Sequence, residues 1–487
     1  MKTYKIIRYT TLAALLTLSF GCEETLQEEI FSQLSPENFL TTQEGIKSVL
    51  DAAYAEGYIN GYSHHSIRNI DEWCTDIEWE TGGGENRTAV LMIDFTWDAT
   101  VGWMYGDMWQ KPYRAIRDAN TVLENLETAN ISDESKTLFE AEARFIRAMS
   151  YYHLYTWFGP VPLRKSTTET LELPRASEED LLNFIETEII ATIPGLPMPG
   201  AELQYGRVNK GGGRAFLCKY YLNTKQWQKC ADMASEIINM GTYELYPDYA
   251  EMFKVQNERN NEFILVFPEI PNTPGNNYIN GAFPAAFAKD PISGLEMQSN
   301  WNNWAAQYRL YDRFYNSFEE EDNRKSLIIN HYINSSGDTV SLLNEDNTRS
   351  FKYWPDPNAI SNEHGNDIAE IRYADILLAR AEALNQLNGP GQESIDLINS
   401  VRTRAGLSGY VLGDFGSAEA LNEAILNERG WEFYSERKRR QDLIRMDKFI
   451  SSAQERGVSN AKPTHVVFPI PQAALDANPM LKQNEGY

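Results

Sequence analysis

The chain has 487 residues, 42% of them hydrophobic and 12% aromatic, which is enough for one large core or for two to three ordinary domains. Its formal charge of −25 repels nucleic-acid phosphates and anionic lipid surfaces, so we exclude nucleic acid as a partner and expect a neutral or cationic ligand. No segment after residue 21 is apolar for long enough to span a bilayer, which excludes a helical membrane-spanning protein.

The first 21 residues have the composition of a targeting signal. Three basic residues precede an apolar run over residues 12–20, which is too short for a membrane-spanning helix. Cys22 follows directly, and this pattern is similar to a bacterial lipoprotein signal, although Ser19 stands where leucine is usual. We predict cleavage before Cys22, lipidation of its thiol and an acidic tether over residues 22–35. An ordinary secretory signal with an incidental cysteine is the alternative.

The first helices of the chain are predicted from caps and periodicity. Ser35-Pro36 has the features of an N-cap and a first turn, which predicts a helix over residues 36–54. Helical periodicity resumes near residue 110 and continues into residues 138–158, where apolar and aromatic side chains recur at steps of three and four. Gly159-Pro160 should end this helix. We expect these two consecutive segments to form an antiparallel pair.

The same helical pattern returns later in the chain. Further pairs are predicted over residues 215–222 with 227–237 and over residues 368–405, and another helix over residues 421–434. Recurrent helix pairs with alanine and aromatic positions are typical of tetratricopeptide-like repeats. We therefore predict a mostly α fold, in which tetratricopeptide-like helix pairs form a right-handed scaffold over residues 36–54, 110–242 and 366–450.

Two long stretches, residues 55–109 and 243–365, break the helical pattern. Both are rich in Gly, Asn and single aromatic residues, and structureless connections of that length usually carry function. Short strands are predicted within the second stretch, over residues 262–267, 326–334 and 348–353.

Other residue types that could carry chemistry favour structural roles. Three cysteines remain after the signal, too few for a disulfide framework, and the helical positions of Cys218 and Cys230 predict buried thiols. His64 and His65 are adjacent, so their side chains diverge, and no third ligand is spaced for them; we predict loop histidines and no metal site. The basic run over residues 437–440 is expected to neutralise nearby carboxylates.

Several separated blocks of the sequence resemble the SusD/RagB family of outer-membrane lipoproteins. Besides the signal, the blocks are Trp157-Phe158-Gly159-Pro160-Val161-Pro162, Arg207-Val208-Asn209-Lys210, residues 371–383, Asn427-Glu428-Arg429 and Phe468-Pro469-Ile470-Pro471. The resemblance implies a single domain over residues 36–487. In it, a helical scaffold carries the two irregular stretches as ligand-binding loops.

The same resemblance implies function and partners. It points to a lipid-anchored protein of the outer membrane that faces the cell exterior and serves polysaccharide utilisation. It implies a SusC-like TonB-dependent transporter as partner, over whose mouth the lipoprotein sits as a lid. The implied role is capture and delivery of an oligosaccharide or polysaccharide, without catalysis and without a cofactor.

A glycan site needs flat aromatic side chains for the C–H faces of sugars and fixed polar groups for their hydroxyls. Tryptophans interleaved with Asp and Asn occur in both irregular stretches. The candidate glycan-binding residues are Asp71, Trp73, Asp76, Trp79 and Trp97, followed by Trp103, in the first stretch, and Trp301, Asn302 and Trp304 in the second. The resemblance marks Asp71 as a recurrent acidic position. Packing against the helices is the alternative for each tryptophan, most of all in the first stretch.

Three other functions stay open at this point. A member of the same family could capture peptides for import, because aromatic loops also suit peptides. A secreted glycosidase would need two carboxylates about 5–10 Å apart, which an acid-rich chain can always offer. A helical scaffold could also bind only another protein.

Overall fold

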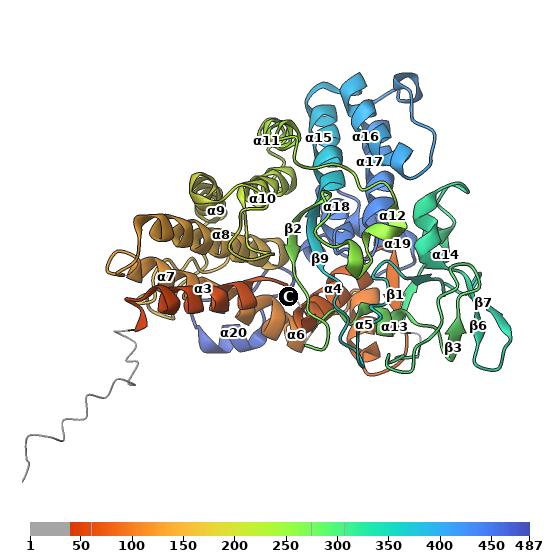
Figure 1. Cartoon of the computed structure of the whole chain (residues 1–487), viewed down its shortest axis with the longest axis horizontal. Helices are drawn as coiled ribbons and strands as arrows, with labels where there is room; N and C mark the ends of the chain where they lie inside the picture. The colour runs from red at the N-terminus through yellow and green to blue at the C-terminus, as the bar shows by residue number, and fades with distance from the viewer. Residues whose placement is uncertain (1–38, 60, 274, 306) are drawn as a thin grey trace, which may run out of the picture.

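The computed structural model describes residues 39–59, 61–273, 275–305 and 307–487. The predicted signal, Cys22, the acidic tether and the helix start at Ser35-Pro36 lie outside these residues. The fold is mostly helical with a few short strands, which confirms the predicted fold class. Figure 1 shows a helical half that extends from the left to the upper right, and a half rich in loops and short strands at the lower right.

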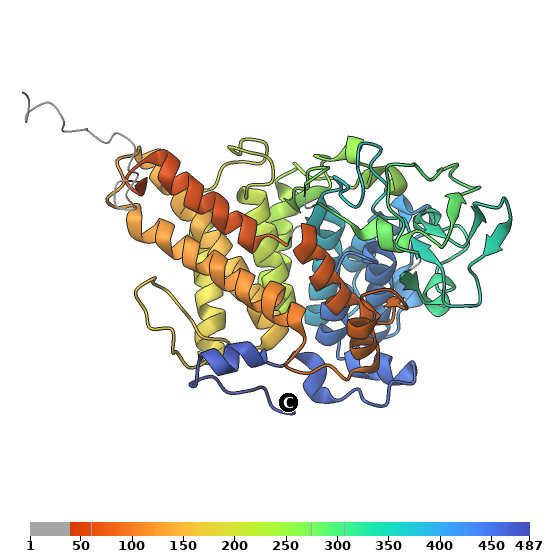
Figure 2. The same ribbon diagram turned by 90° about the horizontal axis from the view of Figure 1, so that it is seen from below.

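The helical half begins with long helices packed side by side. They are α3 (Gln43–Gly57), α7 (Lys111–Asn125), α8 (Asp133–Phe158), α9 (Glu178–Thr192), α10 (Lys210–Asn223) and α11 (Trp227–Asn239). α7 packs against both α3 and α8, as Figure 2 shows, so the predicted pair over residues 110–158 is confirmed. Ser132 caps α8 by accepting the N–H of Ser135 at 3.1 Å, and Gly159 ends it with a φ of +69°.

The scaffold continues through helices near the C-terminal end of the chain. α11 packs against α15 (Tyr373–Asn388), which contacts α16 (Gln392–Arg404) and α17 (Ala418–Phe433). The helix predicted over residues 421–434 is thus present. The pair predicted over residues 368–405 begins only at Tyr373, because residues 368–372 form a strand. The helix pairs are observed, whereas their right-handed, tetratricopeptide-like repeat geometry stays a prediction.

The prediction that residues 55–109 are irregular is wrong. They contain α4 (Gly61–Trp73), α5 (Asn86–Asp94), α6 (Gly102–Tyr105) and the π-helical turn η1 (Gly106–Gln110), which runs into α7. Every residue of α4 from His64 onward is buried, including Arg68, Asn69 and Glu72. The sequence analysis missed α4 because its apolar residues, Ile67, Ile70 and Trp73, stand among polar residues that are typical of loops.

The strands form small antiparallel sheets that attach the loop-rich half to the scaffold. The pairs are β1 (Glu78–Glu80) with β4 (Tyr308–Leu310), β2 (Phe263–Phe267) with β9 (Ile368–Arg372), and β5 (Ile328–Ile329) with β8 (Arg349–Ser350); β3 (Phe287–Lys289), β6 (His331–Asn334) and β7 (Thr339–Ser341) form a three-stranded sheet. The strand predicted over residues 262–267 is confirmed. The other two predicted strands are shorter than expected, and the first is preceded by a 3-10 turn.

Short helices fill the remaining connections. They are η2 (Ile193–Gly195), α12 (Tyr249–Met252), η3 (Val255–Asn257), α13 (Tyr278–Ala282), α14 (Asp312–Tyr315), η4 (Asn323–Leu327), η5 (Leu412–Asp414), α18 (Arg439–Arg445), α19 (Phe449–Glu455), η6 (Pro463–Val466) and α20 (Gln472–Ala477). Within the described residues, no helix combines the length and the apolar character that crossing a bilayer requires.

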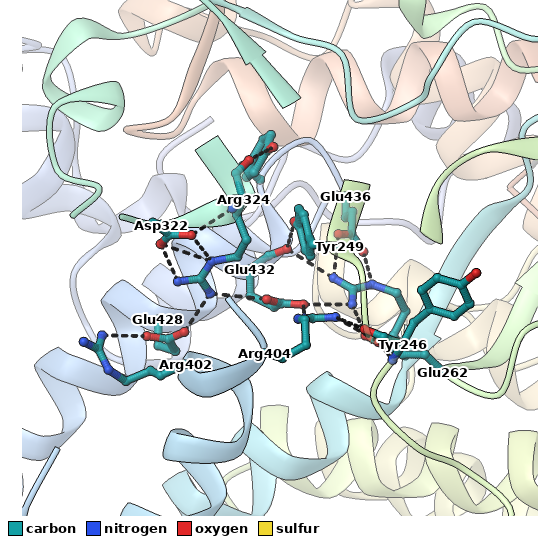
Figure 3. Close-up of polar contacts among 12 residues, drawn as sticks. Tyr246, Tyr249, Glu262, Asp322, Arg324, Arg402, Arg404, Glu428, Glu432 and Glu436 are labelled. Carbon is teal, nitrogen blue, oxygen red and sulfur yellow. Dashed lines mark hydrogen bonds and ion pairs between the residues drawn. The ribbon is translucent and has the colours of Figure 1, made fainter. Parts of the chain in front are cut away.

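A buried network of ion pairs joins the two halves (Figure 3). Arg324 of η4 is fully buried and reaches Glu428 at 2.6 Å and Glu432 at 3.2 Å, both on α17. Arg372 of β9 contacts the same Glu432 at 2.9 Å and Glu436 at 2.8 Å. Each charge has a partner of opposite sign, which offsets the cost of removing it from water. The network fixes the later part of the loop-rich insertion, around Arg324, against the scaffold.

The basic run over residues 437–440 has the predicted role. Its side chains pair with four carboxylates: Arg437 with Glu370 at 2.7 Å, Lys438 with Asp375 at 3.6 Å, Arg439 with Asp76 at 2.8 Å and Arg440 with Asp71 at 3.9 Å. The prediction that this run neutralises neighbouring acids is confirmed.

Candidate ligand-binding surface

α4 is the element that positions the candidate site. Its Arg68 lies between the rings of Tyr278 and Tyr308, with the guanidinium carbon 4.5 and 4.3 Å from the ring centroids, and forms an ion pair with Glu78 of β1. Stacking on two aromatic faces and pairing with a carboxylate compensate the buried charge. Through this one side chain α4 holds α13, β4 and β1 together, and thereby both predicted loop regions.

The two loop regions meet at His65, one turn before Arg68. Trp103 contacts the imidazole edge-on at a centroid distance of 5.8 Å, and Trp304 does so at 5.6 Å. His65 is buried, whereas both indoles are partly exposed. We call His65, Trp103, Trp304 and the exposed Asn302 the aromatic surface. It combines partly exposed rings from the first and the second predicted loop region.

Hydrogen bonds fix Trp304 in this position. Its Nε1 donates to Oδ1 of Asn362 at 2.9 Å, and its backbone N–H donates to the carbonyl oxygen of Asn280 at 2.8 Å. Asn302 donates to the same Asn362 oxygen at 2.9 Å and to Oγ of Ser361 at 2.9 Å. An aromatic platform held by its polar atom loses little rotational freedom when a ligand packs on it.

Two carboxyl groups of different character lie beneath the aromatic surface. Glu85 contacts Nε2 of His65 and accepts hydrogen bonds from Asn69 at 2.9 Å and from the Tyr308 hydroxyl at 3.2 Å. Glu80 sits opposite Tyr308 in the β1–β4 pair and is buried. Neither oxygen of Glu80 has a hydrogen-bond partner among the described residues. Burial, together with the charge of Glu85, raises the pKa of Glu80 to about 8.

Several predicted contact residues lie in the interior instead. Trp73 is fully buried and packs under Trp103 and Tyr308, so its ring presents no face to a ligand. Trp97 is also buried and donates from Nε1 to the Tyr487 hydroxyl at 2.8 Å, within a contact to the C-terminal segment. Both were predicted to contact a ligand from composition alone. In a long irregular stretch, the residues around a tryptophan do not show whether its ring packs in the interior or binds a ligand.

The two predicted aspartates are also turned inward. Asp71 accepts a hydrogen bond from Nε1 of Trp157 at 3.1 Å, and its burial raises its pKa. Asp76 is paired with the guanidinium of Arg439 through two contacts of 2.8 Å. Burial opposes the charge of Asp76, but Arg439 outweighs it and lowers the pKa. Both carboxylates hold α4 and the residues after it to α8 and α18.

Trp79 and Trp301 lie in two separate cavities. Trp79 stacks on Tyr311 with the ring centroids 6.0 Å apart, and both rings line a cavity of about 350 Å³ together with Arg456 and Asn460. Trp301 lines a cavity of about 410 Å³ together with Trp354, Lys254 and Gln298, among others. The structure therefore distributes the predicted tryptophans over the aromatic surface, two cavities and the interior rather than one site.

Sequence reasoning missed some of the residues that shape these sites. His65 was predicted to be a loop histidine, but it lies on α4, a helix that the sequence analysis did not predict. Trp354 and Tyr311 are partly exposed rings that no motif marks. Trp354 follows Tyr353 and Tyr311 follows Leu310, so their sequence neighbours gave no signal that these rings are exposed. Among the described residues, no cluster of three or more metal-ligating side chains occurs.

Comparison with known proteins identifies the family. Residues 220–487 match the SusD family, and residues 32–222 match a family described as starch-binding and associating with the outer membrane. The chain belongs to the SusD family. The first of these matches alone spans more than half of the chain, and the two together cover everything after the predicted tether. The resemblance drawn from separated sequence blocks is thus confirmed.

Relatives of this SusD family member are similar over their full length. SusD-like protein P25 of Formosa agariphila is 26% identical, with 100% of both chains covered. The starch-binding protein SusD of Bacteroides thetaiotaomicron is 22% identical, again with 100% of both chains covered. Among solved structures, a laminarin-binding SusD-like protein has a TM-score of 0.78 at 22% identity, covering 92% of this chain and 100% of its own. The fold is therefore that of SusD-like proteins.

Proposed function

We propose that this protein captures oligosaccharide or polysaccharide at the cell surface on its aromatic surface, without cleaving it. The observation that carries the proposal is the pair of partly exposed indoles, Trp103 and Trp304, held on one buried imidazole. Sugar rings pack their C–H faces on such platforms, and Asn302 and Asn362 beside Trp304 offer amide groups to hydroxyls.

The ligand class follows from charge and from the relatives. The chain carries −25 formal charges, so a neutral glycan meets less repulsion than a sulfated or uronic-acid-rich one. The names of two similar proteins record binding of starch and of laminarin, both of which are neutral glucose polymers. We propose neutral glucans as the first ligands to test. Which linkage is preferred depends on the curvature of the surface formed by the two indoles.

The proposed cellular role is delivery to a SusC-like TonB-dependent transporter. The protein is anchored through a lipid on Cys22 at the outer membrane and faces the exterior, with residues 22–35 as a tether. Support comes from the family match described as associating with the outer membrane and from the signal pattern in the sequence. Two tests separate the parts of this proposal. Palmitate labelling should disappear in Cys22→Ala, and the transporter should co-purify with the wild-type chain from outer membranes.

Affinity electrophoresis in gels that contain laminarin or soluble starch tests the ligand site. We expect the wild-type protein to be retarded and Trp103→Ala/Trp304→Ala to lose at least ten-fold in affinity, because two ring-stacking contacts are removed. Trp354→Ala is the matched control, since it removes a partly exposed indole from a separate cavity. Unchanged retardation of the folded double variant would refute the assignment of the site.

The same samples separate the competing functions. A binding protein leaves the polysaccharide intact, whereas a glycosidase releases reducing ends continuously. Sustained release by the purified chain would overturn the binding proposal. Peptide capture predicts instead that no gel with polysaccharide retards the protein, while a peptide mixture competes for the same tryptophans.

A further inference from the structure

Two cysteines face each other across a helix hairpin in the scaffold. Cys218 lies on α10 and Cys230 on α11, on either side of the short turn that joins the two helices. Their Sγ atoms are 3.9 Å apart, and both side chains are fully buried. The Cys230 thiol also lies 3.8 Å from the carbonyl oxygen of Ala379 on α15. The pair therefore sits where three scaffold helices meet.

We propose that Cys218 and Cys230 form a disulfide in the exported protein. A disulfide requires the two sulfur atoms to approach to about 2.0 Å, with Cα atoms about 4.4–6.8 Å apart. Both thiols are free in the structure, and their Sγ atoms, 3.9 Å apart on the two helices of one hairpin, must come about 1.9 Å closer to form the bond. Cys74 is buried on α4's C-terminal side, where its Sγ donates to the carbonyl oxygen of Ile70 at 3.3 Å. It takes no part in the bond.

The bond would form before the hairpin is buried in the scaffold. In the folded chain the pKa of Cys218 is raised, mainly by the contact with Cys230 and also by burial. Little thiolate is therefore available for exchange. During export the hairpin is a local unit whose cysteines are separated by few residues, so it can close early. The inference rests on the proposed export of the chain, because disulfides persist in oxidising compartments.

The chemistry is a thiol–disulfide exchange with a disulfide-bearing oxidoreductase of the export compartment. One cysteine thiolate attacks the disulfide of the oxidant and forms a mixed disulfide, which releases the first oxidant sulfur as a thiol. The second cysteine then attacks the mixed disulfide and releases the other sulfur. Cys218 and Cys230 lose two electrons and two protons in total, and the oxidant gains them as two thiols.

Peptide mapping of the full chain, purified from outer membranes, tests the proposal. The protein is denatured in guanidinium with N-ethylmaleimide and without reductant, and then digested and analysed by mass spectrometry. We expect peptides that contain Cys218 and Cys230 to be linked, while Cys74 carries the maleimide as an internal control. Maleimide on all three cysteines would overturn the proposal.

The melting temperature supplies a second measurement. The exported protein is unfolded in guanidinium, reduced with a phosphine and refolded, and the same cycle without phosphine is the control. Reduction should lower the melting temperature of the wild type and of Cys74→Ala by several degrees, because the lost cross-link restricted the unfolded chain. The melting temperature of Cys218→Ala/Cys230→Ala should not respond to the reductant. A wild type that does not respond would contradict the proposed bond. Glucan retardation in the affinity gel is independent of this result, so a failure here is distinguishable from a failure of the proposed function.

Discussion

Glu80 is a buried carboxyl group whose environment opposes its ionisation. A carboxyl group buried beside another acid, without a hydrogen-bond partner among the described residues, is costly to ionise. The pKa of Glu80 is about 8 in the folded protein, against about 4.5 in an unfolded chain. Between these two values the folded state holds a proton that the unfolded state has lost. The free energy of unfolding therefore falls as the pH rises through this window.

Glu80→Gln should remove this pH dependence, because the amide has the shape of the neutral acid and cannot ionise. We expect the variant to match the wild type in melting temperature below pH 4.5 and to exceed it by a few degrees above pH 8. Glu320→Gln, at an exposed position, is the control and should follow the wild type throughout. Thermal scans from pH 4 to 9 measure the difference. A difference that shrinks as the pH rises would contradict the assignment.

Single residues also show where sequence reasoning about the site ends. Trp304 was predicted as a ligand contact and is partly exposed, whereas Trp73 was predicted in the same way and is fully buried. Each tryptophan follows a polar residue, so the two look alike in the sequence. Their exposure depends on Tyr308, which packs against both indoles and whose position cannot be read from the neighbouring residues. The composition of the loops could be predicted, but the face that each ring shows to solvent depends on long-range packing.

At the scale of elements, predictability follows the residue types that each helix contains. α8, α10 and α15 each pack in the scaffold and were found from recurring alanine, aliphatic and aromatic positions. α4 was missed, because its apolar residues stand among polar ones such as Arg68 and Glu72, which are buried as well and contact Glu78 and the backbone N–H of Arg437. β9 was included in a predicted helix. All five of its residues are buried, so it lacks the alternation of apolar and polar side chains that marks a half-exposed strand.

At Gly57, the last residue of α3, the helix lies close to α7 and α8, so a larger residue at this position should destabilise the protein. A Cβ atom at this position would lie 2.9 Å from Cγ2 of Ile146 on α8 and 3.3 Å from Cβ of Ala115 on α7. Gly57→Ala should therefore separate α3 from its neighbours and destabilise the protein by about 1–3 kcal/mol. Gly106→Ala is the matched control, since Gly106 has a helical φ of −65° and a Cβ there meets no atom within 4 Å.

Urea denaturation of both variants measures these effects. Because alanine favours helical backbone, Gly106→Ala should be neutral or more stable by up to about 1 kcal/mol. Equal loss of stability in the two variants would show that backbone flexibility, and not the contact between α3 and α8, determines the outcome.

At the scale of the whole molecule, the buried ion pairs decide how the loop-rich half is held to the scaffold. Arg324 belongs to the insertion, and Glu428 and Glu432 belong to α17 (Figure 3). Trp304 belongs to the same insertion, so the position of the aromatic surface depends on a charge cluster that is buried away from it.

Arg324→Met tests this attachment, because it removes the cation and leaves Asp322, Glu428 and Glu432 buried together. Breaking a buried pair from one side costs about 3–5 kcal/mol, and we expect a loss of that size in the free energy of unfolding. Arg313→Met is the control: its pair with Glu455 spans 3.9 Å between exposed side chains, so its removal should change stability by less than about 1 kcal/mol.

Hydrogen exchange locates where the Arg324→Met variant loses stability. If the network joins two halves, amide protection should fall first in the loop-rich insertion around β5, β6 and β8, while α7 and α8 keep theirs. Glucan affinity should fall with it, because Trp304 is positioned by the same segment. A uniform loss of protection would mean that scaffold and insertion unfold as one unit, and the network would then be one part of a common core rather than the joint between two halves.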